Sequence, residues 1–194
     1  MKLEHNSHNK DEFSNDYATP EYIFQALNIK PLEFSLDACA PEKSIWVNLP
    51  AAKYCKDSYA LEEGKDARLD PFYGHVFMNP PYARDADKDK LMLRMREHGD
   101  GIALIPVDTT EWFYLGQYEA IFIPKKRTGF INFKNEDCKT ANGGSISYCT
   151  ALVAWGEWAV NKIMGIDQRI LEGQSFMTQS KFYASQGKLE LTPA

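Results

Sequence analysis

The sequence predicts an α/β protein with a mixed, mostly parallel sheet flanked by helices, and three observations favour this fold class. Apolar, strand-like runs alternate with segments of helical periodicity along most of the chain. Two of these runs end in a polar residue, Asp37 and Asn79, where parallel sheets bind their ligands. A chain of 194 residues with 44% hydrophobic residues can bury one substantial core. We therefore expect a flexible segment over residues 1–16 and a single domain over 17–194, with a C-terminal extension from about residue 157.

The first helix is expected to begin at the tripeptide Thr19-Pro20-Glu21. Thr19 is a suitable N-cap, and Pro20 suits the first helical position because its fixed φ and missing N–H do no harm there. Ile23, Phe24 and Leu27 then share one face, which predicts a helix packed on the core.

A second helix is expected over residues 85–98, where charged residues surround Leu91, Met92 and Met95 at helical spacing and Gly99 follows. Residues 40–75 form a less regular stretch. The other candidates are strands over residues 34–39, 76–78, 101–107, 120–123, 130–133 and 147–155, a short helix over 111–118, and a helix containing Trp158, Ile163, Met164 and Ile166.

The tetrapeptide Asn79-Pro80-Pro81-Tyr82 directly follows the apolar run Val76-Phe77-Met78. Each proline fixes its own φ, lacks an N–H and keeps the preceding residue extended, so the strand must end here in a stiff turn. A strand-ending turn with an exposed aromatic residue is one interpretation of this tetrapeptide.

A binding site for a planar amino group is the other interpretation. The Asn79 side-chain oxygen and the Pro80 carbonyl can accept the two N–H groups of an exocyclic amine and leave the nitrogen lone pair free. Tyr82 would then supply an aromatic face for the base. This chemistry requires no general base of unusual pKa.

Five blocks of the chain, in order, resemble the phage-type DNA N6-adenine methyltransferases over roughly residues 17–156. That resemblance implies the Rossmann-like fold of class I S-adenosylmethionine-dependent methyltransferases and methyl transfer to the N6 amino group of adenine in double-stranded DNA. The blocks are Ala18-Thr19-Pro20, residues 34–40, Asn79-Pro80-Pro81-Tyr82, residues 102–106, and Arg127-Thr128-Gly129-Phe130.

The resemblance also implies which residues form the site. Asn79, Pro80, Pro81 and Tyr82 would be catalytic, and Asp37 would accept hydrogen bonds from the methionine ammonium or the ribose of S-adenosylmethionine. The small residues after Asp37 would let the backbone approach this cofactor. The expected cofactor-binding residues are Thr19, Pro20, Asp37, Ala38, Cys39, Ala40 and Asp57.

Asp57 matches the family loosely. It resembles an acidic position that could touch the adenosine, but it opens a generally acidic stretch that an exposed loop explains equally well. Relatives also carry an aromatic residue after the position of Asp66, where this chain has Ala67-Arg68-Leu69. The alignment across this loop is therefore open.

The net charge of −5 requires any DNA contact to be local, because phosphate binding depends on lysine and arginine. The stretch 125–139 is basic and contains interleaved phenylalanines. A solvated loop is the alternative, but next to an adenine site we favour DNA contact. The expected DNA-binding residues are Lys125, Lys126, Arg127 and Lys134.

The cysteines and histidines are scattered, which favours buried free thiols over a disulfide or a metal site. No apolar run is long enough to span a membrane, and the N-terminus is polar, so we expect a soluble, cytoplasmic protein with no membrane partner.

Other functions stay open at this level. The same tetrapeptide occurs in enzymes that methylate RNA adenine, cytosine N4 or glutamine, and a catalytically silent DNA-binding relative would keep the fold. The best candidates for reading a DNA sequence are residues 83–90 and 125–145, and a short site, a relaxed preference and a homodimer stay open as alternatives.

Overall fold

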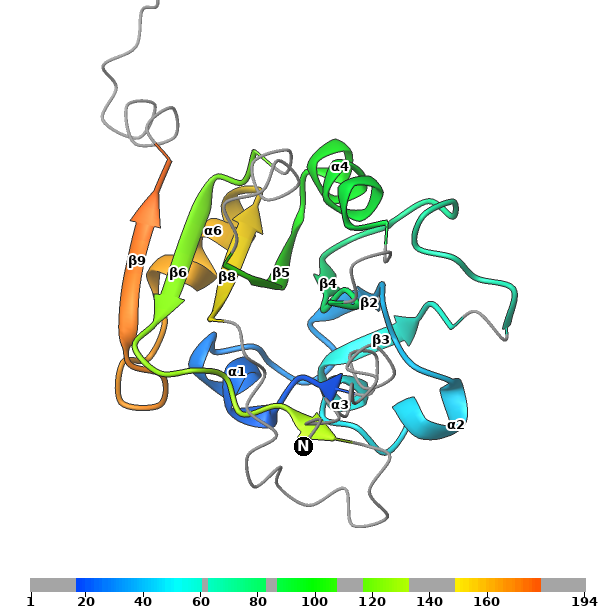
Figure 1. Cartoon of the computed structure of the whole chain (residues 1–194), viewed down its shortest axis with the longest axis horizontal. Coiled ribbons are helices and arrows are strands. Elements are labelled where there is room, and N and C mark those ends of the chain that lie inside the picture. Colours follow the sequence, from blue (N-terminus) through cyan, green and yellow to red (C-terminus); the bar gives the residue numbers. More distant parts are fainter. Residues whose placement is uncertain (1–16, 61–62, 83–86, 108–116, 133–148, 179–194) are drawn as a thin grey trace, which may run out of the picture.

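A computed structural model of the chain describes residues 17–60, 63–82, 87–107, 117–132 and 149–178. Seven strands form the central sheet in the order β3-β2-β4-β5-β8-β6-β9 (Figure 1). They are β2 (Phe34–Asp37), β3 (Cys55–Ser58), β4 (Val76–Met78), β5 (Gly101–Pro106), β6 (Ala120–Pro124), β8 (Thr150–Trp155) and β9 (Gly173–Met177).

The strand directions place five carboxyl ends at one edge of the sheet. β2 pairs in parallel with β3 and β4, and β4 pairs in parallel with β5. Because β8 is antiparallel to both β5 and β6, β6 runs in the same direction as β5. The strand order reverses at β2, whose neighbours are β3 on one side and β4 on the other. A crevice for ligands is expected beyond such a reversal.

Helices cover both faces of this sheet. On one face, α1 (Glu21–Ala26), α3 (Ala51–Tyr54) and α6 (Glu157–Met164) bury side chains against Phe34 and Phe77. The ring of Phe24 stacks on Tyr54 with centroids 4.6 Å apart and contacts Phe77 at 4.9 Å. On the other face, α4 (Lys88–His98) buries Leu91, Met92 and Met95. The short α2 (Lys43–Trp46) follows β2, and its Trp46 is buried in the same cluster as α1, α3 and α6.

A second, two-stranded sheet lies beside the carboxyl edge. Its strands, β1 (Tyr17–Ala18) and β7 (Ile131–Asn132), are antiparallel, and the chain that leaves β6 crosses this edge to reach β7 (Figure 1). The small sheet therefore joins the N-terminal block to residues 131–132, which lie within the basic stretch 125–139.

Several predicted elements are confirmed. The strand over 76–78 has those bounds, the helix predicted over 85–98 contains α4, and Gly99 ends it with φ 72°. The strands predicted near residues 34, 101, 130 and 147 contain β2, β5, β7 and β8, and β6 extends the strand predicted over 120–123 by one residue. Helix α6 contains the predicted Trp158 and Ile163. Residues 1–16, the helix predicted over 111–118 apart from its last two residues, and Phe133 lie outside the described residues.

Three expectations were wrong. Thr19 does not cap α1, because the helix begins at Glu21 with Pro20 as N-cap and no side chain caps it. The stretch 40–75, expected to be less regular, contains α2, α3 and β3. Cys149 is exposed although a buried thiol was expected there, whereas Cys55 is buried and Cys39 is half-buried. Thr19 fails as a cap because it lies one residue too early, since Pro20 with φ −71° and ψ 150° holds the N-cap position.

Candidate active site

Asp37 and Asn79 lie at the ends of neighbouring strands. Asp37 of β2 is in register with Phe77 of β4, two residues before Asn79. The backbone N–H of Ala38 donates a hydrogen bond to the carbonyl oxygen of Phe77 at 2.9 Å, so the pairing continues one residue beyond β2. The structure thus brings the turn after β2 beside the Asn-Pro-Pro-Tyr turn, at the point where the strand order reverses.

Asp37 is a buried carboxylate without a cationic partner among the described residues. Its side chain is only 4% exposed, and Nε1 of Trp46 donates a hydrogen bond to Oδ2 at 2.9 Å. Burial raises the pKa of Asp37 to about 6, against the opposing effects of Trp46 and the backbone N–H of Cys39. A ligand that brings a positive charge to Asp37 would stabilise its ionised form.

Thr19 lies in the N-terminal block that joins this site. It is 3% exposed, and its Oγ1 is buried without a hydrogen-bond partner in the described structure. The same block contacts the motif, because Nδ2 of Asn79 donates a hydrogen bond to the carbonyl oxygen of Tyr17 at 3.2 Å. An unpaired buried hydroxyl is costly and is often kept where a ligand completes its bonding.

Asn79 is oriented by two hydrogen bonds. Because Nδ2 donates to Tyr17, Oδ1 faces the motif, where it accepts a hydrogen bond from the hydroxyl of Tyr82 at 3.1 Å. The same hydroxyl lies 3.0 Å from the carbonyl oxygen of Leu104 in β5. One proton is shared between two acceptors, so Oδ1 retains capacity to accept another N–H.

Tyr82 is half-buried rather than fully exposed. Its ring meets Phe130 edge-on, with centroids 5.8 Å apart and an interplanar angle of 89°. Burial raises the pKa of the Tyr82 hydroxyl well above its ordinary value, so the group stays protonated and acts as a donor. Phe130 also contacts Tyr17 at 6.4 Å and thereby ties β7 to both the N-terminal block and the motif.

Asp57 lies near the carboxyl end of β3, in register with Leu36 of β2. Its side chain is half exposed and contacts Nζ of Lys43 at 3.3 Å and the hydroxyl of Tyr73 at 2.9 Å. Partial burial opposes ionisation, but the Ser58 N–H, Tyr73 and Lys43 together hold the pKa of Asp57 below its usual range. Asp57 is therefore an ionised carboxylate beside the Asp37 strand.

Sequence reasoning missed the side chains that support these carboxylates. Trp46 holds Asp37, and Nζ of Lys43 lies 4.6 Å from the centroid of the Trp46 ring while contacting Asp57. The run Lys43-Ser44-Ile45-Trp46 has no motif that marks this role. The only available signal for this role was the spacing of a cationic and an aromatic residue, Lys43 and Trp46, three positions apart.

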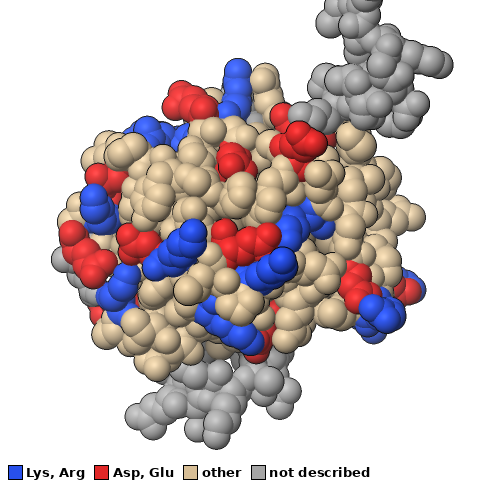
Figure 2. Space-filling view, turned by 180° about the vertical axis from the view of Figure 1, so that it is seen from behind, with Lys and Arg blue, Asp and Glu red and all other residues tan. Residues whose placement is uncertain are grey.

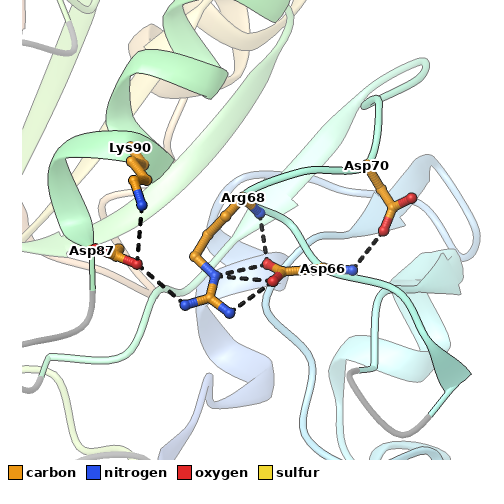
Figure 3. Close-up of polar contacts among 5 residues, drawn as sticks. All are labelled: Asp66, Arg68, Asp70, Asp87 and Lys90. Carbon is orange, nitrogen blue, oxygen red and sulfur yellow. Dashed lines mark hydrogen bonds and ion pairs between the residues drawn. The ribbon is translucent and has the colours of Figure 1, made fainter.

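An ion-pair network joins the loop after β3 to the start of α4 (Figure 3). Arg68 contacts Asp66 at 2.7 Å and Asp87 at 3.2 Å, and Lys90 contacts Asp87 at 3.5 Å. The charges of Asp66 and Arg68 act on the turn after β2. Burial and the carboxylates of Asp37 and Asp66 raise the pKa of the Cys39 thiol, while Arg68 lowers it. Arg68 was not predicted as a functional residue. The available signal was the Asp-x-Arg spacing, because it allows the Arg68 N–H to donate a hydrogen bond to Oδ1 of Asp66 at 2.9 Å.

The predicted DNA-binding lysines and arginine have different environments. Lys125 forms an ion pair with Glu172 at 2.8 Å, whereas Lys126 and Arg127 line an open cavity of about 400 Å³. Lys134 lies outside the described residues. On the face drawn in Figure 2, basic and acidic side chains are interleaved rather than gathered by sign.

The strand-order reversal, the carboxylate-bearing strand ends and the polar turn after β4 define an α/β fold of the methyltransferase class. Residues 6–173 match the family model described as DNA N-6-adenine-methyltransferase (Dam). The chain belongs to this family and is a DNA adenine-N6 methyltransferase, which confirms the resemblance seen in the sequence. No curated protein and no solved structure gave a match. Among the described helices, none has the length and apolar character of a membrane span.

Proposed function

We propose that the protein transfers a methyl group from S-adenosylmethionine to N6 of adenine in double-stranded DNA, at the crevice between the ends of β2 and β4. The observation that carries this proposal is the Ala38–Phe77 hydrogen bond, which sets the Asp37 turn beside Asn79. Two sites built on adjacent strand ends can hold two reactants in contact, and orientation of this kind lowers the barrier to transfer.

The residues of the first site fit this cofactor. Asp37 is buried, has no cationic partner among the described residues, and would bind the methionyl ammonium. Thr19 Oγ1 would gain the hydrogen bond that it lacks in the described structure. Ala38, Cys39 and Ala40 form the small-residue turn along which the cofactor would lie, with Pro20 beside Thr19. Asp57 would accept bonds from the adenosine. When bound, S-adenosylmethionine supplies an electrophilic methyl group on a sulfonium sulfur.

The residues of the second site fit the target amine. Oδ1 of Asn79 and the carbonyl oxygen of Pro80 would accept the two N–H groups of the adenine amine, which withdraws its lone pair from the ring and directs it outward. Pro81 keeps this turn rigid, because neither proline can relax its φ. Tyr82 anchors the turn to Leu104 and offers the half-exposed aromatic surface on which an extruded base would rest.

The test is transfer of labelled methyl to a duplex, to each of its single strands and to an RNA of the same sequence, read at base resolution. We expect label on N6 of adenine in the duplex. Label confined to cytosine, to RNA or to protein would overturn the proposed substrate. Binding of S-adenosylhomocysteine, measured separately by calorimetry, tests the cofactor assignment without turnover.

A further inference from the structure

The cavity that contains Lys126 and Arg127 lies on the catalytic edge of the sheet. It is formed where β6 ends at Pro124, and β6 runs in the same direction as β4 and β5, whose ends carry the site. Its far wall is the loop 168–172, which the Lys125–Glu172 backbone bond at 2.8 Å holds against the end of β6. The cavity and the active site therefore lie at the same edge of the sheet.

The lining is cationic. Three of the eight lining residues, Lys126, Arg127 and Arg169, are positively charged, and the single carboxylate, Glu172, is bonded to Lys125 at 2.8 Å. Lys125 thereby lowers the pKa of Glu172 and offsets its charge. Within the described chain, neither Lys126 nor Arg127 forms an ion pair. The other lining residues are Tyr22, Gln168, Ile170 and Leu171.

Two uncharged side chains and a free nitrogen of Arg169 add hydrogen-bond donors to this lining. The Tyr22 hydroxyl accepts the N–H of Gly129 at 3.2 Å and keeps its own proton, since burial raises its pKa. Oε1 of Gln168 accepts the N–H of Gly173 at 3.0 Å, which turns its amide donors outward. Arg169 bonds Asp167 through Nε and Nη2 and leaves Nη1 for another acceptor. Such a set of donors matches an anion with several oxygens.

The cavity lies close enough to the Asn-Pro-Pro-Tyr motif to contact the phosphate of a nucleotide near the target adenine. Arg127 is three residues before Phe130, and three residues span at most about 11 Å. The Phe130 ring contacts Tyr82 of the motif. Since phosphates on one strand follow each other by roughly 3.4 Å of helix axis, the cavity lies within a few nucleotides of the extruded adenine.

We propose that this cavity is a binding site for a backbone phosphate of the DNA substrate, with Lys126, Arg127 and Arg169 as its cations. The inference rests on the proposed function and extends it, because it assigns the phosphate contact to a built cavity with two walls. It also assigns Lys125 to holding Glu172 and the far wall, not to contacting DNA.

The first experiment measures duplex binding and methyl transfer by the K126A/R127A variant at several salt concentrations. We expect the slope of log K against log salt to fall by about 1, and KM for DNA to rise about tenfold, because one phosphate contact is lost. The turnover at saturating DNA and the affinity for S-adenosylhomocysteine should stay within twofold of the parent. The matched control is K30A/R96A, which removes the same charges from the opposite edge of the sheet and should keep the parent's slope.

The second experiment changes the electrostatic potential in the cavity without removing one of the proposed phosphate contacts. Ile170 is 44% exposed on the cavity wall, so a charged residue there should be tolerated. We expect Ile170→Glu to weaken duplex binding and Ile170→Lys to strengthen it, each effect diminishing at high salt.

The two proposals fail in distinguishable ways. If the parent methylates duplex DNA while K126A/R127A keeps its salt slope and KM, the cavity assignment is overturned and the reaction stands. Equal binding by the two Ile170 variants would also overturn it. If the parent methylates no DNA, the proposed function fails, whatever the salt slopes show.

Discussion

The hydroxyl of Tyr82 lies 3.1 Å from Oδ1 of Asn79, so the motif's own aromatic residue donates to the oxygen that we assign to the target amine. The bond is shared with the carbonyl oxygen of Leu104 at 3.0 Å. Tyr82 therefore has two separable parts, a hydroxyl that fixes the turn and a ring that can support a base.

Tyr82→Phe should destabilise the protein by about 1 kcal/mol, because one net hydrogen bond is lost. Turnover should remain within a few-fold of the parent, since the ring and the Asn79 acceptor are both retained. Denaturant unfolding and steady-state transfer measure the two effects. Tyr82→Ala is the comparison, and it should lose most transfer; equal turnover by the Phe and Ala variants would exclude a role for the ring.

Asn79→Ala should reduce methyl transfer by about 10²-fold or more, a typical cost of deleting one preorganised polar contact at a reacting group. Affinity for S-adenosylhomocysteine should change little, because Asn79 is assigned to the amine. Single-turnover transfer and calorimetry provide the two readouts. Asn161→Ala on the exposed face of α6 is the matched control. Retention of the parent's transfer rate by Asn79→Ala would contradict the assignment.

Thr19→Val should have opposite effects on the free protein and on cofactor binding. Removing a buried hydroxyl that has no partner should leave stability unchanged or raise it by about 1 kcal/mol. Affinity for S-adenosylhomocysteine should fall, because the hydroxyl would bond only in the complex. Thermal unfolding with and without the ligand tests both. A variant that loses stability and binds the ligand as the parent does would refute the role of Thr19.

The buried Asp37 predicts a pH dependence of stability. Its folded-state pKa of about 6 exceeds the ordinary value of 3.8, so between these values the native state binds more protons than the unfolded state. Stability should therefore fall as pH rises from about 4 to about 6, by roughly 3 kcal/mol from this group. Asp37→Asn should lack this component, and the difference between the two unfolding curves across this range measures it. Parallel curves would contradict the burial argument.

Cofactor binding should have the opposite dependence on pH. An ammonium group favours the ionised carboxylate, so affinity for S-adenosylhomocysteine should rise as pH increases through about 6. Trp46→Phe removes the donor to Oδ2, which should raise the pKa of Asp37 further and move this transition to higher pH. Calorimetric titration between pH 5 and 8 locates the midpoint. An unchanged midpoint in Trp46→Phe would show that Trp46 does not tune the carboxylate.

The sequence by itself determined the features that depend on local backbone chemistry. Two prolines end β4 at Met78, because they can neither donate to a ladder nor leave their φ, and Gly99 ends α4, because it adopts φ 72° without strain. The spacing of Leu91, Met92 and Met95 fixed the buried face of α4. The alternation of strand-like and helical segments likewise predicted the fold class, and the resemblance of five blocks implied the family.

Only the tertiary structure decided which distant residues meet. The ends of β2 and β4 adjoin because these strands pair across the intervening residues 38–75, and Trp46 bonds Asp37 from a helix that the sequence did not reveal. Thr19 was predicted as a helix cap, yet Pro20 holds that position and the Thr19 hydroxyl is buried without a partner in the described structure. These contacts are set by burial of the sheet faces and by strand register, which are properties of the whole core and leave no trace in the local pattern.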